Sequence, residues 1–425
     1  MSTLASAAPP DPDPAVRLAT IRALRDSGDP AAPLALGKFL TDSDPAVRKL
    51  AATALRALRW EPATAAEHVA LAVADGEWSQ VRALGTAAVP ALCAWLRRPG
   101  DSVLPFVLEL LVELRDPRAV PPLCRGLKGR DAAVRERFIQ ALAAFGTRAV
   151  RPLIGQLSSD SGPAREGAAR ALCLIRDPGA VPSLAAGLAD PDQCVREVLI
   201  EALRAQGKAA VPELRRRLQH AHPLVREGAI RALEGADDPR LVEPLCARLA
   251  DDYWGVRESA ARAVAPFRDR CARKPLCRLL QDPIALVRTA AARALGELED
   301  EGAVEALSLS LMDDCSETRR AAAGALGRIG REPALRALEH RLRRGPNYET
   351  IPEVREAIRT AIRWIEEQSR PRASLPIPGT PAAPEREHLP IPGNPVSAAL
   401  PGDEQGAGAS PKAPTVSLWQ RWFQR

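Results

Sequence analysis

The chain has few aromatic residues and lacks the short motifs on which common enzyme chemistry depends. Only 4% of its 425 residues are Phe, Trp or Tyr, a composition that suits thin helices stacked without one large central core. No apolar run approaches the roughly 18 residues of a transmembrane helix, and residues 1–14 lack the features of a signal peptide. There is no Cys-x-x-Cys pair, Gly-rich phosphate loop or Gly-x-Ser-x-Gly motif. We therefore expect a cytoplasmic protein with no stable membrane insertion, no metal and no cofactor.

Neither charge nor cysteine content indicates a special chemistry. The net charge is +6, which is modest for this length and does not by itself indicate a nucleic-acid partner. Four of the eight cysteines follow the same leucine of a repeated segment, and free cysteine at such a place is a small hydrophobic residue. These four are Cys93, Cys124, Cys246 and Cys277.

The dominant feature of the sequence is a repeat. A motif close to Asp-x-x-Val-Arg returns about every 31 residues. Its arginine is found at Arg17, Arg48, Arg135, Arg165, Arg196, Arg226, Arg257, Arg288, Arg319 and Arg355. From Arg135 to Arg319 the steps are 30, 31, 30, 31, 31 and 31 residues. Residues 60–85 depart from the pattern, and Pro105 stands where the next unit should have its arginine.

Each repeat has two halves that both read as short helices. One half follows Ala-Val-Pro-x-Leu, as at residues 119–123, with proline early in the segment, where a helix tolerates it. The other half, as at residues 131–142, has apolar residues on one helical face. A turn with Gly or Asp-Pro leads to the next unit. The unit is therefore a hairpin of two antiparallel helices.

This pattern resembles the HEAT repeat, in particular the short type named after phycobilisome lyases. The resemblance covers residues 15–369 and implies an all-α fold, a right-handed α-solenoid of about 11–12 helical hairpins. Residues 1–14 read as a disordered arm. Residues 370–415 are rich in Pro, Gly and Ala and read as a disordered linker. An aromatic and basic peptide, residues 416–425, ends the chain.

The aspartates ahead of the repeat arginines are expected to cap the helices that follow them. Four lie four residues before their arginine, namely Asp13, Asp44, Asp131 and Asp192. Three lie five residues before it, namely Asp160, Asp252 and Asp314. The resemblance implies that this aspartate and the arginine also form a ladder between stacked repeats.

Two charged rows are expected on the second helices, which line the concave side of a HEAT-like solenoid. One position after the repeat arginine the row is acidic, with Glu136, Glu166, Glu197, Glu227 and Glu258. Five positions after it the row is mostly basic, with Arg170, Arg231, Arg262 and Arg293. Glu166–Arg170, Glu227–Arg231 and Glu258–Arg262 have the favourable i,i+4 order for pairing along one helix. The rows are either a solvated face or a mixed-charge groove that holds a protein partner.

Apolar residues offer two further candidate contacts. Phe106 and Leu110 take these two positions in the unit without arginine, where they form an exposed patch or are turned inward. In the terminal peptide, Leu418, Trp419, Trp422 and Phe423 would share one helical face. Three alternatives remain open for this peptide: a docking motif for a partner, a weak peripheral membrane contact, or a segment that folds back on the solenoid.

Enzymatic relatives of the HEAT fold find no matching residues here. Deoxyhypusine hydroxylase binds iron through His-Glu dipeptides, and none of the five histidines precedes a glutamate. No residue specific to bilin lyases can be matched, and the glutamate row interrupts the positive surface that a nucleic-acid binder needs. The sequence thus predicts a non-enzymatic scaffold that binds a protein partner on its concave face. A bilin-lyase-like or other small-molecule-handling protein is the first alternative, and a nucleic-acid binder is the second.

Overall fold

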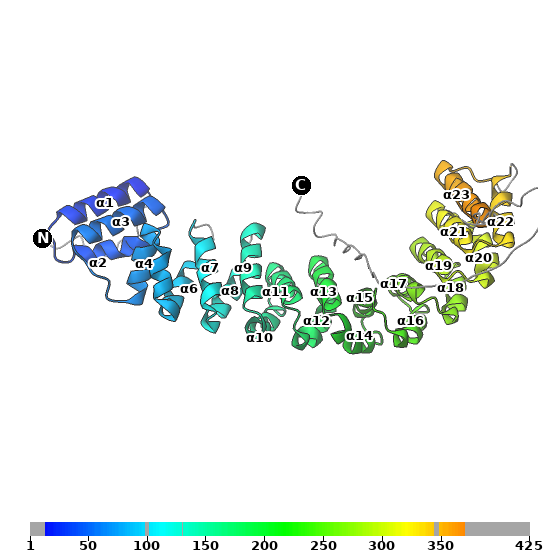
Figure 1. Ribbon diagram of the computed structural model, residues 1–425, viewed down its shortest axis with the longest axis horizontal. Coiled ribbons are helices and arrows are strands. Elements are labelled where there is room, and N and C mark those ends of the chain that lie inside the picture. The colour runs from blue at the N-terminus through cyan, green and yellow to red at the C-terminus, as the bar shows by residue number, and fades with distance from the viewer. Residues whose placement is uncertain (1–12, 98–101, 130, 344–347, 370–425) are drawn as a thin grey trace, which may run out of the picture. The chain divides into compact units, whose positions relative to one another are not determined.

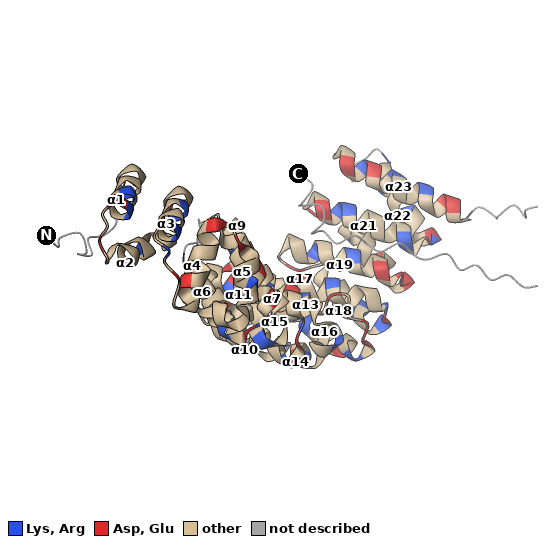
Figure 2. Cartoon of the chain, turned by 60° about the vertical axis from the view of Figure 1, so that its left-hand side comes forward, with Lys and Arg blue, Asp and Glu red and all other residues tan. Residues whose placement is uncertain are grey.

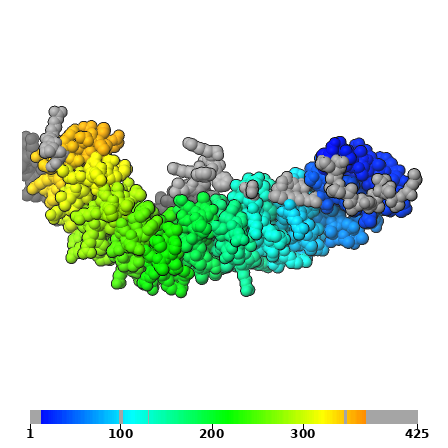
Figure 3. Space-filling view, turned by 180° about the vertical axis from the view of Figure 1, so that it is seen from behind, coloured from blue at the N-terminus to red at the C-terminus, as the bar shows by residue number. Residues whose placement is uncertain are grey.

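The computed structural model describes residues 13–97, 102–129, 131–343 and 348–369, which are helical with short connections and contain no strand. After helix α1, the helices form eleven successive pairs, from α2/α3 to α22/α23. The first helices of the pairs form one layer and the second helices form the other (Figure 1). Each unit lies beside its neighbours in sequence order (Figure 3). The predicted all-α solenoid of helical hairpins is confirmed.

The bounds of the helices show that the first member of a pair is usually the shorter one. The first helices are α2 (Ala32–Gly37), α4 (Ala65–Asp75), α6 (Val89–Trp95), α8 (Val120–Gly126), α10 (Thr147–Gln156), α12 (Val181–Ala186), α14 (Val211–Arg217), α16 (Val242–Arg248), α18 (Arg273–Leu279), α20 (Val304–Ser310) and α22 (Glu332–Leu342). The second-layer helices are α1 (Pro14–Asp26), α3 (Pro45–Ala57), α5 (Trp78–Ala83), α7 (Leu104–Leu114), α9 (Ala132–Ala144), α11 (Gly162–Ile175), α13 (Gln193–Ala205), α15 (Pro223–Leu233), α17 (Trp254–Val264), α19 (Ala285–Leu298), α21 (Ser316–Ile329) and α23 (Pro352–Ser369).

Four of the seven aspartates expected to cap second-layer helices do so, whereas Asp160, Asp252 and Asp314 lie one residue ahead of the N-caps Ser161, Tyr253 and Cys315. Asp13, Asp44, Asp131 and Asp192 each accept a hydrogen bond from the backbone N–H two residues later, at 2.7–2.8 Å. These bonds satisfy amides that have no partner inside the helix. Capping thus fixes where each of these helices starts, and with it the direction of the face that bears the repeat arginine.

The connections between units are of two kinds, with either a glycine or another residue in the left-handed region. The two 30-residue steps contain Gly146 and Gly207, whose positive φ values of 58° and 56° suit glycine. Three of the four 31-residue steps instead have a non-glycine residue with positive φ, followed by an aspartate that caps a 3₁₀ turn. These are Arg176–Asp177, Arg268–Asp269 and Glu299–Asp300.

The buried apolar side chains form two clusters that meet at α4. The smaller cluster comes from α1 to α4 and includes Ile21, Leu55 and Ala70. The larger cluster begins with Val69 of the same helix and continues through α23. Helix α4 belongs to the irregular stretch noted in the sequence, so the departure from the repeat is also a division of the core.

The chain divides into two units, Met1–Arg370 and Pro371–Arg425. The second unit, and with it the expected linker and terminal peptide, lies outside the described residues. The arm expected at residues 1–14 also falls there, except that Asp13 and Pro14 begin α1.

Candidate protein-interaction surface

A ladder of buried ion pairs links successive units through the repeat arginines. Arg226 Nε and Nη2 donate to the two carboxylate oxygens of Asp251 in the next unit, at 2.8 and 2.6 Å. The remaining nitrogen, Nη1, donates to the carbonyls of His220 and Ala221, both at 2.9 Å. The two side chains are only 8% and 2% exposed. Because burying two charges costs about as much free energy as their attraction returns, the pair mainly fixes how one unit sits on the next.

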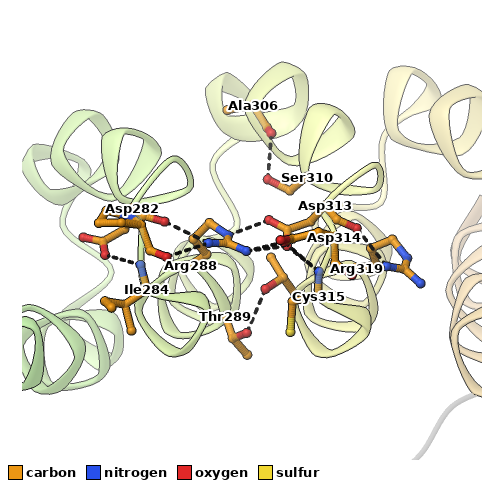
Figure 4. Close-up of polar contacts among 12 residues, drawn as sticks. Asp282, Ile284, Arg288, Thr289, Ala306, Ser310, Asp313, Asp314, Cys315 and Arg319 are labelled. Carbon is orange, nitrogen blue, oxygen red and sulfur yellow. Dashed lines mark hydrogen bonds and ion pairs between the residues drawn. The ribbon is translucent and has the colours of Figure 1, made fainter.

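The same geometry recurs along the chain. Figure 4 shows it from Asp282 through Arg288 to Asp313 and Arg319. The bridges between units are Arg17–Asp42, Arg165–Asp190, Arg226–Asp251, Arg257–Asp282, Arg288–Asp313 and Arg319–Glu349, at 2.6–2.9 Å. From Arg226 to Glu349 the bridges are continuous over four successive junctions.

The ladder carboxylates are not the ones that the sequence pattern was expected to supply. Asp42, Asp190, Asp251, Asp282 and Asp313 each lie six residues before the next repeat arginine, ahead of the capping position. Of the aspartates named earlier, Asp252 and Asp314 do bond to the preceding unit's arginine, at 2.6 and 2.5 Å. Asp13, Asp44, Asp131 and Asp192 serve as caps, so their expected ladder role is corrected.

The ladder is interrupted where the step shortens to 30 residues. In those two steps the sixth residue before the next arginine is Ser159 or His220, not an aspartate. The facing arginines, Arg135 and Arg196, donate only to carbonyls of their own turns among the contacts that the described residues make. These two junctions therefore lack the buried cross-link. Their glycine turns do not set them apart, because Gly28, Gly235 and Gly330 have positive φ values in steps that keep the bridge.

The acidic and basic rows on the second helices form a second, more exposed set of cross-links. Arg170 lies 2.8 Å from Glu166 and 3.6 Å from Glu136 of the preceding unit. Arg231 donates to both carboxylate oxygens of Glu197, at 2.9 and 2.5 Å. Most of these arginines are therefore already bound by glutamates of this chain.

Two of the three expected i,i+4 pairs form, and the Glu227–Arg231 pair does not form among the contacts of the described residues. Arg262 does bond to Glu258 at 3.2 Å, and it also bonds to Glu234. Arg231, however, turns from Glu227 to the preceding unit, which corrects that pair. The carboxylate of Glu227 packs instead against Gly255, where a Cβ would come within 2.8 Å of it. Burial raises the pKa of Glu227, because the carboxylate has lost water without gaining an ion pair.

The second helices α17 and α19 border a groove of about 530 Å³. We call it the α17–α19 groove. Its floor is made of small and apolar residues such as Ala263, Ala290 and Ala294, and Leu286 stands at its side, 61% exposed. The charged side chains on the rim are Glu234, Glu258, Glu297, Glu317, Arg262 and Arg293. Four carboxylates against two guanidinium groups make the rim acidic by two charges.

Arg293 is the most available arginine of the basic row. Its side chain is 59% exposed, and the carboxylate of Glu317 lies 3.9 Å away, beyond hydrogen-bonding distance. The structure thus brings Glu258, Arg262 and Arg293 of the predicted rows to one groove. Glu136, Glu197, Arg170 and Arg231 take part in cross-links between units. Leu286 and the rim carboxylates Glu234, Glu297 and Glu317 are additions that the sequence rows did not contain.

A comparison with protein families now settles what the repeat is. Residues 1–89, 120–204, 181–265, 242–315 and 274–363 match the family model for HEAT repeats. This chain belongs to the HEAT-repeat family. The match covers well over half of the chain, and no curated protein matches it.

Among solved structures, several helical-repeat proteins are similar to this HEAT-repeat chain. The karyopherin Kap121p bound to Ste12p shares 15% identity over 84% of this chain and 44% of its own, with a TM-score of 0.48. The Escherichia coli protein YibA shares 20% identity over 63% and 97%, with a TM-score of 0.41. Human deoxyhypusine hydroxylase shares 23% identity over 67% and 98%, with a TM-score of 0.28. None of the three bears on the function of this chain.

The apolar candidates of the irregular HEAT units are only partly at the surface. Phe106 is 47% exposed and stacks on Trp78, with ring centroids 5.0 Å apart. Leu110 is buried, together with Leu108 and Leu111. An exposed patch of Phe106 and Leu110 is therefore wrong for Leu110, because α7 is buried on two sides. Leu418, Trp419, Trp422 and Phe423 lie outside the described residues.

Cys124 lies in the core of the HEAT units, and Cys93, Cys173, Cys246 and Cys277 pack against it, whereas Cys194 and Cys271 are exposed. Burial raises the pKa of Cys124 to about 11. Burial and a contact with Cys271, 3.4 Å between sulfur atoms, raise the pKa of Cys246 to about 12. Both thiols are therefore protonated at neutral pH and poor nucleophiles. Across the described ranges, no helix could cross a membrane and no three His, Cys, Asp or Glu side chains gather as metal ligands would.

Proposed function

We propose that this HEAT-repeat protein is a non-enzymatic, cytoplasmic scaffold that binds a protein partner in the α17–α19 groove. The observation that carries the proposal is the combination of an apolar floor, an exposed Leu286 and an acidic rim. Exposed apolar surface with a polar border is typical of protein interfaces. The partner segment would insert apolar side chains into the groove and place Lys or Arg near the rim carboxylates.

The charged rows take a different part in this proposal from the one expected at first. Arg170 and Arg231 hold glutamates of neighbouring units, so reversing their charge would loosen the stack as well as the surface. Arg293 and Leu286 can be changed with less damage, since both are largely exposed. A test of binding should therefore use these two residues.

The experiment is quantitative affinity purification with mass spectrometry, using the full chain. The double variant Leu286→Asp/Arg293→Glu is compared with Leu174→Asp, a matched control at an exposed leucine of α11 outside the groove. We expect proteins that the wild type and the control retain to be lost with the double variant. Equal recovery by all three would show that this groove is not the binding site.

The terminal peptide is proposed as a second, tethered contact. A flexible connection raises the effective concentration of a linked binding event, so even a weak docking peptide would strengthen the assembly. Truncation after Ser369 tests this point in the same purification. Loss of a partner that survives the groove substitutions would support the peptide, and an unchanged set of partners would remove it from the proposal.

A further inference from the structure

The opposite layer carries a second groove, between the first helices α18 and α20, which we call the α18–α20 groove. Its volume is about 520 Å³. The side chains that decide its character are Arg273, Lys274, Arg278, Glu305, Ala306 and Leu309. Three are cationic and one is acidic, so the polarity is opposite to that of the α17–α19 groove.

The cations of this groove are available for a ligand. Lys274 and Arg278 are exposed, and neither has an ion pair or hydrogen bond with any residue that the structure describes. Arg273 is different, because its guanidinium bonds to Asp300 at 3.0 Å. Arg170, Arg231 and Arg262 of the second helices are bound by glutamates of the same chain. Lys274 and Arg278, in contrast, are exposed to solvent without such a partner among the described residues.

An apolar side chain stands at the centre of this surface. Leu309 is 68% exposed, and it lines both the α18–α20 groove and a neighbouring hollow of about 490 Å³. That hollow also includes Val304, Ser308 and Pro333. Met312, one turn further along, is 51% exposed. A large exposed aliphatic residue flanked by two hollows offers contact area that a highly hydrated ligand would leave unused.

We infer that the α18–α20 groove binds an acidic segment of a polypeptide that carries a large aliphatic residue beside its carboxylates. The guanidinium of Arg278 can hold a carboxylate through two parallel hydrogen bonds, and Lys274 adds a mobile positive charge. The aliphatic residue would cover Leu309. This surface lies on the other layer from the proposed partner groove and does not depend on it.

Nucleic acid fits the same surface less well. A phosphate backbone requires a run of cations along its path. Here the run stops at α20, where Glu305 and Leu309 are the exposed residues. Two unpaired cations beside an apolar centre are enough for a short acidic peptide and too few for a duplex.

The test is selection from a random twelve-residue phage-displayed peptide library on the full chain, with counter-selection on the Lys274→Glu/Arg278→Glu variant. We expect the retained peptides to contain Asp or Glu next to Leu, Ile, Met or Phe. Fluorescence anisotropy with a selected peptide should show binding at least about tenfold weaker for Lys274→Glu/Arg278→Glu and for Leu309→Asp. Thermal unfolding of each variant verifies that the fold is retained.

Two matched controls separate this site from general charge and from the proposed partner groove. Arg151→Glu changes an exposed cation of α10 with no described partner, and Leu286→Asp changes the other groove. Both should leave peptide binding unchanged. The inference is overturned if selected peptides lack acidic residues, if they bind the double variant equally, or if a single-stranded DNA oligonucleotide competes for the same residues more tightly than any peptide.

Discussion

The regular C-terminal end of the solenoid and the irregular stretch that follows α3 hold their helices together by different means. From α15 to α23 the units are joined by four consecutive buried ion pairs. Between α3 and α7, no such bridge is made by the residues that the structure describes. There the guanidinium of Arg48 lies 5.4 Å from the ring centroid of Trp95, and Trp78 stacks on Phe106. In the irregular stretch, contacts of aromatic side chains thus stand in place of the buried ion pairs.

Second helices approach one another very closely at the regular end. A Cβ on Gly296 would lie 2.8 Å from Ala325, and one on Gly327 would lie 2.8 Å from Ala361. Thr289 and Thr318 share a buried hydrogen bond of 3.0 Å at the same layer (Figure 4). Small residues let α19, α21 and α23 pack tightly. Both basic and acidic residues are found along α21 and α23 (Figure 2). A regular repeat thus permits a thin, polar-bridged stack that bulky residues would prevent.

The largest effect is expected from breaking one bridge of the regular end. Asp251→Ala leaves the buried Arg226 without its main partner, which should destabilise the protein by about 3–5 kcal/mol. Desolvation raises the pKa of Asp251, but hydrogen bonds from Arg226 and the Tyr253 N–H outweigh it and leave the pKa below its usual value. This bridge therefore contributes stability above the ordinary Asp pKa of about 3.9 and loses it as the pH falls further. Urea unfolding measures the difference.

The matched control for this bridge is Asp252→Ala, which removes an 89% exposed partner of the same arginine. Its loss should change the free energy of unfolding by at most about 1 kcal/mol. Hydrogen exchange should rise in α15 to α19 for Asp251→Ala and remain near wild type in α1 to α7. Equal effects of the two alanines would contradict the view that burial of the pair matters.

A smaller loss is expected at the irregular end. Trp95→Phe replaces the ring beside Arg48 by a weaker π partner and leaves unfilled volume in the core, a loss of about 1–2 kcal/mol. Increased hydrogen exchange in α3 to α8 would locate the damage. The control is Trp254→Phe, at a half-exposed ring of α17; if it were as harmful as Trp95→Phe, the aromatic contact with Arg48 would have no special part.

A gain is expected where a missing bridge can be supplied. His220 occupies the ladder position opposite Arg196, and its Nδ1 accepts from the N–H of His222, as a ladder aspartate would. His220→Asp should therefore join Arg196 to the next unit and stabilise the protein by about 0.5–1 kcal/mol. Gln219→Asp adds the same charge one residue away and should have no such effect. Destabilisation by His220→Asp would show that the 30-residue step also displaces the ladder position.

The smallest effect concerns the unpaired carboxyl of the acidic row. Burial raises the pKa of Glu227, so stability is lost as the pH rises from its unfolded value of about 4.3 through its folded value. Glu227→Gln should melt slightly higher than wild type at neutral pH and equally below about pH 4. Glu258→Gln, which removes an ion-paired carboxylate, should show no such gain. Identical melting curves for Glu227→Gln and wild type at all pH values would contradict the expectation.

Much of the fold could be predicted from the sequence because a repeat shows each unit many times. The two helices per unit, the caps at Asp44 and Asp192 and the irregular stretch near Trp78 were all visible in the spacing. The ladder aspartate was also visible, since an aspartate recurs six residues before Arg48, Arg196, Arg257, Arg288 and Arg319. The helix cap and the ladder bridge both use an aspartate, and the two aspartates lie only two residues apart. Their spacing alone therefore does not tell which one forms the bridge.

The candidate site was harder to predict than the fold. Glu258, Arg262 and Arg293 of the predicted rows line one groove. The spacing in the sequence, however, does not indicate which arginines are free to meet a partner. That depends on contacts between units, such as Arg231 with Glu197 in place of Glu227. The predicted exposure of Leu110 was wrong for a similar reason, because its burial depends on how neighbouring units cover α7. Both grooves arise between helices of different units, which a pattern within one unit does not reveal.

The loss of the buried bridge at two junctions has a mechanical consequence. In four junctions the arginine of one unit is bound by Asp251, Asp282, Asp313 or Glu349 of the next. A tilt of one unit on its neighbour would distort this buried ion pair. At Ser159 and His220 the buried bridge is missing, and the ion pairs that cross these two junctions, Arg170–Glu136 and Arg231–Glu197, are more exposed. Bending of the solenoid should therefore be largest at these two junctions, whereas the units from α15 to α23, which four buried bridges join, should move together as a rigid body.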